Sequence, residues 1–346
     1  MTLESEIDSI LLNQDLSIQQ SKNAFRGLFR HRQHNSDFGM KILALLQKKG
    51  IHSNEIVGLI RVIHELEKPI AGFEPIPYLV DGCGTGGDGA QTINISTLAC
   101  LVAAAGGAYV AKHGNRSISS KCGSADLLES LGVKIDASQA KMLRALKICR
   151  IGYFHAPLYH PIFQKVQMIR RELARKKIKT IFNLIGPLVN PLRPERQVVG
   201  VFQKDLTLLL ARVVKKLGWK HAIIVWNHDG LDEITTTRRS LAIELKEGII
   251  TRKTLNPKVF GFKLGKRSEL KGGTVSYNCR IAKKILSGRD KGTRNNTIVF
   301  TAAVLLYVSG QAENIRQGIK IARKALGSGS ALFTLKQLVV LSHGIS

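Results

Sequence analysis

The chain has 346 residues, of which 44% are apolar and 6% aromatic, enough for one large globular domain or two smaller ones. No apolar run reaches 18 residues without a charge, so a membrane-spanning helix is not expected. The first ten residues carry Glu4, Glu6 and Asp8, which fits neither a secretion signal nor a transit peptide, and we expect a cytoplasmic protein.

Positive charge dominates the composition. The 52 Lys and Arg residues against 25 Asp and Glu residues give a formal net charge of +27. This balance indicates acidic partners (nucleic acid, a membrane surface or phosphorylated metabolites) or a basic surface that is only solvated, which we favour. The densest basic run consists of Arg170, Arg171, Arg175, Lys176, Lys177 and Lys179.

Five scattered cysteines form no C-x-x-C pair, so neither disulfides nor a zinc site is expected. Cys83 and Cys122 lie beside the glycine-rich segments described below. We interpret them as small reduced residues that fill tight space, with a nucleophilic role as the alternative.

The first 70 residues are predicted to be helical. Residues 43–46 belong to a helix that ends near Gly50, and Ser53-Asn54-Glu55 is expected to cap a second helix at 56–66. Pro69, Pro75 and Pro77 then mark a linker.

From Tyr78 onward, strands and helices alternate. Strands are expected at 78–81, 108–111, 152–155, 197–201, 222–226 and 241–245. Helices are expected at 96–105, 125–131, 138–148, 205–217 and 277–286, followed by 295–309, 315–326 and 332–341. A helical segment followed by alternating strands and helices predicts a small all-helical domain and a large α/β domain with a central sheet.

A glycine-rich loop follows the first strand. Gly82, Gly84 and Gly87 match the G-x-G-x-x-G dinucleotide fingerprint, but no Asp or Glu occurs between Gly89 and Ala125 to bind a ribose, so a nicotinamide cofactor is not expected. A P-loop motif is also missing. Strand, glycine loop and helix start remain a typical phosphate-binding arrangement, with an ordinary glycine-rich turn as the alternative.

A second loop of the same kind follows the second strand. It begins at Lys112-His113-Gly114-Asn115-Arg116 and continues through several serines to Gly123-Ser124-Ala125-Asp126. Two such loops in tandem, the second with cations and hydroxyls, favour a phosphorylated ligand.

These motifs resemble the anthranilate phosphoribosyltransferase family. The matching segments are G-T-G-G-D-G (84–89), N-I-S-T (94–97), K-H-G-N-R-S-I-S-S (112–120), G-S-A-D (123–126), T-I-F-N-L-I-G-P-L-V-N-P (180–191) and D-G-L-D-E (229–233). The resemblance implies the nucleoside phosphorylase/phosphoribosyltransferase class of fold. It places residues 1–75 and an excursion at about 158–191 in the α domain, residues 76–346 in the α/β domain, and the active site in a cleft between them. It also implies a homodimer formed through the α domain.

The substrates implied are 5-phosphoribosyl 1-diphosphate and anthranilate, with Mg²⁺ as the cofactor. The implied donor-binding residues are Gly84, Gly87, Asp88, Thr92, Asn94, Ile95, Ser96, Thr97, Lys112, His113, Gly114, Asn115, Arg116, Ser117, Ile118, Ser119, Ser120 and Ser124. For Arg116 we favour a structural role, in which it holds the loop through a carboxylate, over a phosphate contact.

Metal and acceptor residues follow from the same resemblance. Ser96, Asp232 and Glu233 are the implied metal ligands, and hard oxygen atoms suit Mg²⁺; a surface acidic pair is the alternative for Asp232 and Glu233. Gly84, Asn115 and Arg170 are the implied anthranilate contacts, with the Arg170 guanidinium on the carboxylate. No general base is assigned, although His113, His155 and His160 could border the acceptor.

The chain departs from the family pattern at one place that matters. Where members commonly have R-R-E-L-G before T-I-F-N, this chain has R-R-E-L-A-R-K-K-I-K, without the glycine and with about three additional residues. A smaller departure is one extra residue in W-N-H-D-G-L-D-E. Two alternatives therefore stay open: a transferase of the same fold with another acceptor, and a catalytically inactive relative that binds nucleic acid.

Overall fold

The computed structural model describes residues 14–30, 36–117, 120–176 and 178–344. Ile118, Ser119, Lys177 and the acidic residues at the N-terminus lie outside the described residues.

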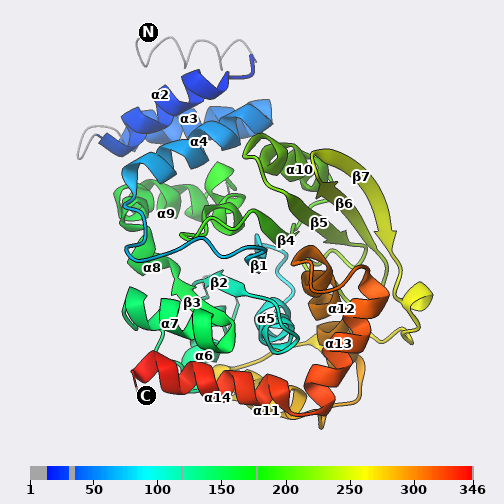
Figure 1. Cartoon of the computed structure of the whole chain (residues 1–346). Helices are drawn as coiled ribbons and strands as arrows, with labels where there is room; N and C mark the ends of the chain where they lie inside the picture. Colours follow the sequence, from blue (N-terminus) through cyan, green and yellow to red (C-terminus); the bar gives the residue numbers. More distant parts are fainter. Residues whose placement is uncertain (1–13, 31–35, 118–119, 177, 345–346) are drawn as a thin grey trace.

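A seven-stranded sheet forms the centre of the molecule (Figure 1). Its order is β3 (Ile151–His155), β2 (Val110–Gly114), β1 (Val80–Gly84), β4 (Arg196–Gly200), β5 (His221–Asn227), β6 (Ser240–Lys246) and β7 (Ile249–Leu255). The first five strands in this order are parallel, and β6 and β7 are antiparallel additions. The carboxyl ends of β1, β2, β4 and β5 therefore meet at one edge of the sheet, where open parallel sheets bind ligands.

The six predicted strands are confirmed, with shifts of one to three residues at most ends. The strand expected at residue 78 begins at Val80, because Tyr78 has a positive φ of 60° and is 57% exposed. Strand β7 was not predicted. It is an edge strand joined to β6 by the two-residue turn Glu247-Gly248, where both residues have positive φ.

Alternate residues of the strands face two different cores. Val198, Ile223 and Val225 pack with α5 (Ile95–Ala105) and α12 (Thr293–Val308). Val199 and Ile224 pack on the other face with α10 (Leu206–Lys216) and the N-terminal helices. This alternation follows from the two-residue period of a strand, and a sheet covered on both faces explains why its strands are apolar throughout.

The remaining helices cover the α5 side and the far end of the sheet. They are α6 (Ser124–Ser130), α7 (Gln139–Cys149), α11 (Val275–Leu286), α13 (Ile315–Gly327) and α14 (Ser330–His343), with short 3₁₀ turns η4 (Pro257–Phe260) and η5 (Arg267–Leu270). All eight helices expected after residue 90 are confirmed with end shifts of up to two residues. No single helix in the described part of the chain is long and apolar enough to cross a membrane.

A helical layer lies on the other side of the sheet. It contains α2 (Ile18–Arg30), α3 (Ser36–Lys49), α4 (Ser53–Leu66), α8 (Ala156–Tyr159), η1 (Pro161–Val166), α9 (Gln167–Arg175), η2 (Ile181–Asn183) and η3 (Gly186–Val189). The later segments pack on the early helices, as in the edge-on contact of Phe182 with Phe25 and Phe29 at 6.5 and 6.3 Å. The chain thus returns to this layer after strand β3, while the assignment of residues 158–191 to the α domain and the domain boundary near residue 75 stay predictions.

The cap of α4 differs from the predicted one. His52, not Ser53, is the N-cap: its Nδ1 accepts a hydrogen bond from the Asn54 N–H, and the Glu55 carboxylate accepts one from the His52 N–H at 2.7 Å. Glu55 is fully buried, and it also accepts hydrogen bonds from Leu16 N–H and Lys49 Nζ. Glu55, expected only as part of the helix cap, therefore also links three segments of the helical layer.

Candidate active site

The loop that carries Asp232 and Glu233 packs on the ends of β1 and β4. A Cβ atom added to Gly84 would lie 2.3 Å from Asp232 Oδ2, and one added to Gly200 would lie 1.6 Å from the Asp232 carbonyl oxygen. Neither position has room for a side chain. The Gly86 N–H donates a hydrogen bond of 2.6 Å to Asp232 Oδ2, so the first glycine loop and the acidic loop form one unit.

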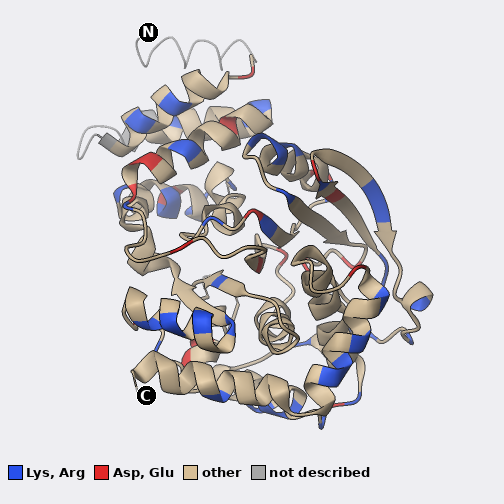
Figure 2. Cartoon of the chain, in the orientation of Figure 1, with Lys and Arg blue, Asp and Glu red and all other residues tan. Residues whose placement is uncertain are grey.

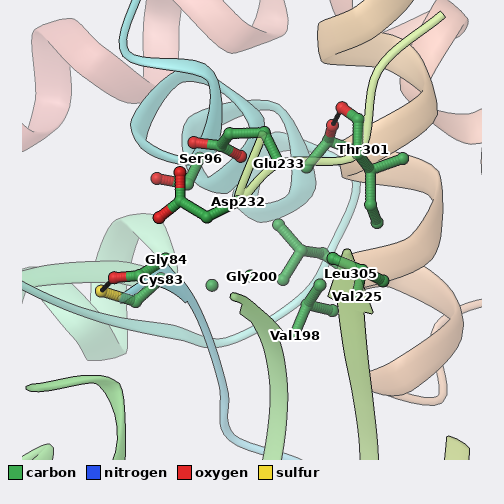
Figure 3. A pocket seen from close by; sticks show the side chains of 12 residues that line it. Cys83, Gly84, Ser96, Val198, Gly200, Val225, Asp232, Glu233, Thr301 and Leu305 are labelled. Atoms are coloured by element: carbon green, nitrogen blue, oxygen red, sulfur yellow. Dashed lines mark hydrogen bonds between the residues drawn. The ribbon is translucent and has the colours of Figure 1, made fainter. Parts of the chain in front are cut away.

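Ser96, Asp232 and Glu233 lie together above a small cavity (Figure 3). Its volume of about 10 Å³ is close to the minimum that holds one water molecule. Polar groups line the cavity on one side, and Val198, Val225, Ile234 and Leu305 line the other. The oxygen atoms of the serine and the two acids thus meet at the start of α5 with an apolar base beneath them.

The acids in this unit oppose one another's ionisation. Burial, followed by the charge of Asp88, raises the pKa of Asp232 to about 7. Burial also raises the pKa of Glu233 well above its ordinary value, with Asp232 and Asp88 adding to the effect and a hydrogen bond from the Ser96 backbone opposing it. Burial together with like charge is the cause in both cases, and a cation would remove the repulsion.

These oxygen atoms fit a magnesium ion that is shared with an anionic ligand. Asp232 and Glu233 are buried or half-buried, so the alternative of a surface acidic pair is wrong. In the described part of the chain, no three His, Cys, Asp or Glu side chains form a complete metal site. Two carboxylates and a serine hydroxyl suffice only when water and phosphate oxygens complete the shell, which is how Mg²⁺ is usually bound.

The loop after β2 is held by Asp126 and Glu129. Asp126 Oδ2 accepts hydrogen bonds from the N–H groups of Ser117 and Gly123 at 3.1 and 2.8 Å. Arg116 donates to both Glu129 oxygens at 2.7 and 2.9 Å and to Asp126 Oδ1 at 3.0 Å. This geometry agrees with the structural role favoured for Arg116.

The serines of this loop are turned toward one another. Ser117 Oγ lies 2.7 Å from Ser120 Oγ and accepts a hydrogen bond from the Ser120 N–H. Ser124 lies over Gly114, where an added Cβ would be 2.1 Å from Ser124 Oγ. Asn115 accepts a hydrogen bond from the Arg116 N–H through its side chain. The loop is therefore already ordered by internal contacts at these positions.

Asn94, at the start of α5, is bound to the second loop and to α11. Its amide donates to the Cys122 carbonyl at 3.0 Å and its oxygen accepts from Asn278 Nδ2 at 3.1 Å. Thr92 forms an isolated antiparallel β-bridge with Lys271. Ile95 and Thr97 are buried at the start of α5. The Asp88 carboxylate accepts a hydrogen bond from the Ala90 N–H. Asn278 was not expected from the sequence, because an amide on a helix carries no signal for such a contact.

Lys112 differs from an exposed phosphate ligand. It is 2% exposed, and its ammonium donates to the His113 carbonyl at 2.7 Å. Burial alone would lower the pKa of Lys112, but Cys83 and the fully buried Asp81 together raise it. Asp81 in turn accepts from Asn190 Nδ2 at 2.9 Å, which ties β1 to the end of the excursion. No sequence pattern predicted that these two charged side chains would be buried near each other.

Arg170, the implied contact of the acceptor carboxylate, lies among aromatic rings. The Arg170 guanidinium lies 5.7 Å from the Phe163 ring centre and 5.5 Å from that of Phe182, and burial lowers the pKa of Arg170. His160 is 5.6 Å from Phe163, centre to centre. A cation beside aromatic faces suits a planar aryl acid, and the two phenylalanines were missed because core aromatics have the same sequence pattern.

The histidines form one buried chain and one separate site. Glu67 Oε1 lies 2.8 Å from His160 Nδ1, and His160 Nε2 lies 3.1 Å from His113 Nε2. Burial, with His160 and Lys112 nearby, holds the pKa of His113 well below its ordinary value, so this ring is neutral. His155 instead stacks on Tyr153, with a centre distance of 6.2 Å. None of these contacts identifies one of the histidines as a general base.

The cysteines are unsuited to nucleophilic chemistry. Burial raises the pKa of Cys83 to about 12 and that of Cys122 to about 11, so both thiols stay protonated at neutral pH. Their interpretation as packing residues is the one that the structure supports.

Comparisons with known proteins show the family of the chain. A model of the glycosyl transferase family, a/b domain, matches residues 77–332. The chain is 41% identical over 301 residues to the anthranilate phosphoribosyltransferase of Bacillus cereus, which covers 87% of this chain and 86% of that relative. The chain belongs to the anthranilate phosphoribosyltransferase family.

Solved structures of the family have the same fold. The crystal structure of anthranilate phosphoribosyltransferase from Thermus thermophilus matches with a TM-score of 0.88 and 32% identity, over 98% of this chain and 99% of that one. The Saccharomyces cerevisiae family member in complex with PRPP and Mg matches with a TM-score of 0.86 and 26% identity, over 99% and 98% of the two chains. The resemblance expected from the motifs, and the α/β class of fold, are thereby confirmed.

Proposed function

We propose that the chain transfers the 5-phosphoribosyl group from 5-phosphoribosyl 1-diphosphate to the amine of anthranilate, with Mg²⁺ as the cofactor. In this reaction the anthranilate nitrogen forms a bond to ribose C1, the bond from C1 to the diphosphate oxygen breaks with its electron pair on diphosphate, and the nitrogen loses a proton. The observation that supports it best is the hydrogen bond from the Gly86 N–H to Asp232, which joins the loop that carries Asp232 and Glu233 to the first glycine loop.

The residues divide into a donor side and an acceptor side. The two glycine loops supply backbone N–H groups and hydroxyls to the phosphates, and Ser96, Asp232 and Glu233 would hold Mg²⁺. When bound, the ion stabilises charge on the departing diphosphate. Arg170, with Phe163 and His160 beside it, would hold the anthranilate carboxylate and ring.

The neutral aryl amine needs no strong base. His113 is neutral and buried, and its ring faces His160 rather than a charged partner. Its proposed role is to hold His160 in place and not to remove a proton before attack. A proton can leave to water once the carbon–nitrogen bond has formed.

The test of the reaction compares acceptors. Diphosphate release is measured with the donor, Mg²⁺ and either anthranilate, another aminobenzoate or no acceptor. Release that requires anthranilate supports the proposal, because the basic segment before Thr180 is where another acceptor preference would arise. Equal or greater release with a different acceptor would replace anthranilate, and no release with any acceptor would contradict a transferase.

A nucleic-acid-binding surface is the second candidate function. Lys and Arg are spread over most helices (Figure 2), and a groove of about 910 Å³ beside α11 is lined by Arg280, Lys283, Lys284 and Arg289 with no acidic residue. Phosphate attraction without base contacts supports non-specific binding only. This activity is proposed as secondary to the transfer reaction.

The dimer and the domain arrangement are also proposals. Met168, on α9, is 82% exposed and Leu66, at the end of α4, is 46% exposed, so the helical layer presents apolar side chains to its surroundings. We propose a homodimer formed through this layer, which should show twice the chain mass in size-exclusion chromatography with light scattering. We also propose that the helical layer and the α/β part are two domains that meet near residue 75. Location in the cytoplasm stays a prediction.

A further inference from the structure

Lys179 extends from the basic segment to the first glycine loop. Its Nζ lies 3.2 Å from the Gly87 carbonyl oxygen, to which it donates a hydrogen bond, and 3.7 Å from the centre of the Phe202 ring. Gly87 belongs to the loop after β1, Lys179 to the excursion, and Phe202 to the segment after β4. One ammonium group thus joins three segments that are far apart in the sequence.

Lys179, Gly87 and Phe202 pack against one another. A Cβ added to Gly87 would lie 3.6 Å from Lys179 Nζ and 3.6 Å from Phe202 Cδ1, so all three residues are in van der Waals reach. Thr180, the next residue, is buried, and its N–H donates a hydrogen bond of 2.7 Å to Asn183 Oδ1. The backbone at the base of the lysine is therefore fixed, while the aromatic face fixes its end.

Lys179 also differs in charge environment from its neighbours. Lys176 pairs with Glu172 at 3.1 Å and Arg170 lies between aromatic rings. Within the described residues, no Asp or Glu forms an ion pair with Lys179. Its positive charge is therefore not tied up in a direct ion pair at the loop that would receive a diphosphate, where a cation strengthens anion binding.

We propose that Lys179 is a positioning residue of the donor site, which holds the glycine loop against the helical layer and adds positive charge beside the diphosphate. The proposal rests on the proposed function and assigns a role to the segment in which this chain departs from the family pattern. Loss of the ammonium should weaken the donor and leave the acceptor unaffected, because Lys179 contacts the first loop and not Arg170.

Two matched variants test the proposal. Lys179→Met keeps the length and the apolar stem but removes the ammonium, and Lys176→Met makes the same change of charge at an exposed position three residues away that contacts Glu172 instead. Calorimetric titration with 5-phosphoribosyl 1-diphosphate and Mg²⁺, without acceptor, should show binding weakened roughly tenfold or more for Lys179→Met. It should stay within about twofold of the unmodified protein for Lys176→Met.

Two further variants separate loop positioning from general charge. Lys179→Arg should recover most of the donor affinity, since the guanidinium keeps the charge and can stack on Phe202. Phe202→Leu should weaken the donor in the same direction as Lys179→Met, because it removes the support of the ammonium. In steady-state kinetics the loss should appear in KM for the donor, with KM for anthranilate unchanged.

The outcomes distinguish this proposal from the proposed function. Equal donor binding by Lys179→Met and the unmodified protein, or equal weakening by Lys176→Met, would overturn the role of Lys179 while leaving the transferase standing. An unmodified protein that binds no phosphoribosyl donor would contradict both. Lys179 is exposed, and an unchanged unfolding temperature of the variant shows that the fold is intact.

Discussion

Asp232 and Glu233 are held in a position that a folded protein would avoid without a cation. Burial and the charge of Asp88 raise the pKa of Asp232, and burial with the charges of Asp232 and Asp88 raises that of Glu233. The loop packs directly on Gly84 and Gly200, where no side chain would fit. Such local cost commonly marks a functional site.

The first prediction concerns this acidic pair. Asp232→Asn with Glu233→Gln should lower kcat by roughly 100-fold or more, because the cation that stabilises the leaving group loses its ligands. The fold should persist, since the change removes buried like charge. The measurement is turnover and thermal unfolding with and without Mg²⁺.

A matched pair of exposed acids provides the control. Asp136→Asn with Glu195→Gln makes the same change of charge away from the site and should leave turnover near normal. Near-normal activity of the Asp232/Glu233 variant at limiting Mg²⁺ would show that the metal assignment is mistaken.

The second prediction separates acceptor from donor. Arg170→Ala should raise KM for anthranilate roughly tenfold or more, as expected when a charged hydrogen-bond partner is lost, with little change in KM for the donor. Ser120→Ala should do the reverse. The adjacent exposed Arg171→Ala is the control, and equal effects of Arg170→Ala on both substrates would contradict this division of the site.

Lys112 is a poor choice for the same experiment. Its ammonium is buried near Asp81, so Lys112→Ala would leave a buried carboxyl without its cation and destabilise the fold. A loss of activity there would not report on phosphate binding.

At the scale of elements, strands β5 to β7 are joined by a buried acid. Burial alone would raise the pKa of Glu244, but hydrogen bonds from His221, Lys253 and Tyr307 outweigh it and lower the pKa to about 2. His221 and Glu244 lie 2.8 Å apart on neighbouring strands, and Lys253 reaches from the edge strand. This network stabilises an edge strand that has little apolar surface of its own.

The third prediction follows from the sign of that shift. A carboxyl whose folded pKa is lowered from 4.5 to about 2 stabilises the fold above pH 4.5, and this contribution is lost as the pH falls toward 2. Glu244→Gln should therefore lower the free energy of unfolding by roughly 2 kcal/mol at pH 7. The difference between variant and unmodified protein should shrink between pH 4.5 and 2, as measured by denaturant titration. A difference that is independent of pH would contradict the ionic account.

Some elements could be predicted from sequence and others could not. The buried parallel strands are short apolar runs beside glycines, and their order along the chain was clear. Strand β7 reads Ile-Ile-Thr-Arg-Lys-Thr-Leu, and its side chains are mostly exposed, so apolar alternation did not reveal it. The cap of α4 was misplaced by one residue because a histidine, an uncommon N-cap, replaced the expected serine.

At the scale of the whole molecule, the motifs predicted which loops meet but not how they are held. Glycine loops, serines and the acidic pair carry residue types that only a few kinds of chemistry use. Asp81, Asn190, Asn278 and Lys179 act through contacts between segments about 80 to 185 residues apart, as in the bonds of Asn190 to Ala111 and Asn278 to Asn94. Such pairing depends on the folded arrangement and leaves no local pattern.

The fourth prediction concerns the charge of +27. Oligonucleotide binding should fall by orders of magnitude between low and physiological salt, because it rests on phosphate attraction. Replacing Arg280, Lys283 and Lys284 with Gln, or Arg175, Lys176 and Lys177 with Gln, should each reduce binding at low salt. Catalysis should persist, because neither set includes Asp232, Glu233 or the glycine loops. A salt titration with parallel kinetics measures this, and binding that survives physiological salt in both variants would contradict a diffuse basic surface.

The most direct test of the whole account is the loss of anthranilate fluorescence after mixing the protein with anthranilate, 5-phosphoribosyl 1-diphosphate and Mg²⁺. The account predicts a loss that requires all three components and disappears in the Asp232→Asn, Glu233→Gln variant. No loss of fluorescence, together with tight, sequence-selective oligonucleotide binding at physiological salt, would contradict the enzyme and favour a nucleic-acid-binding relative.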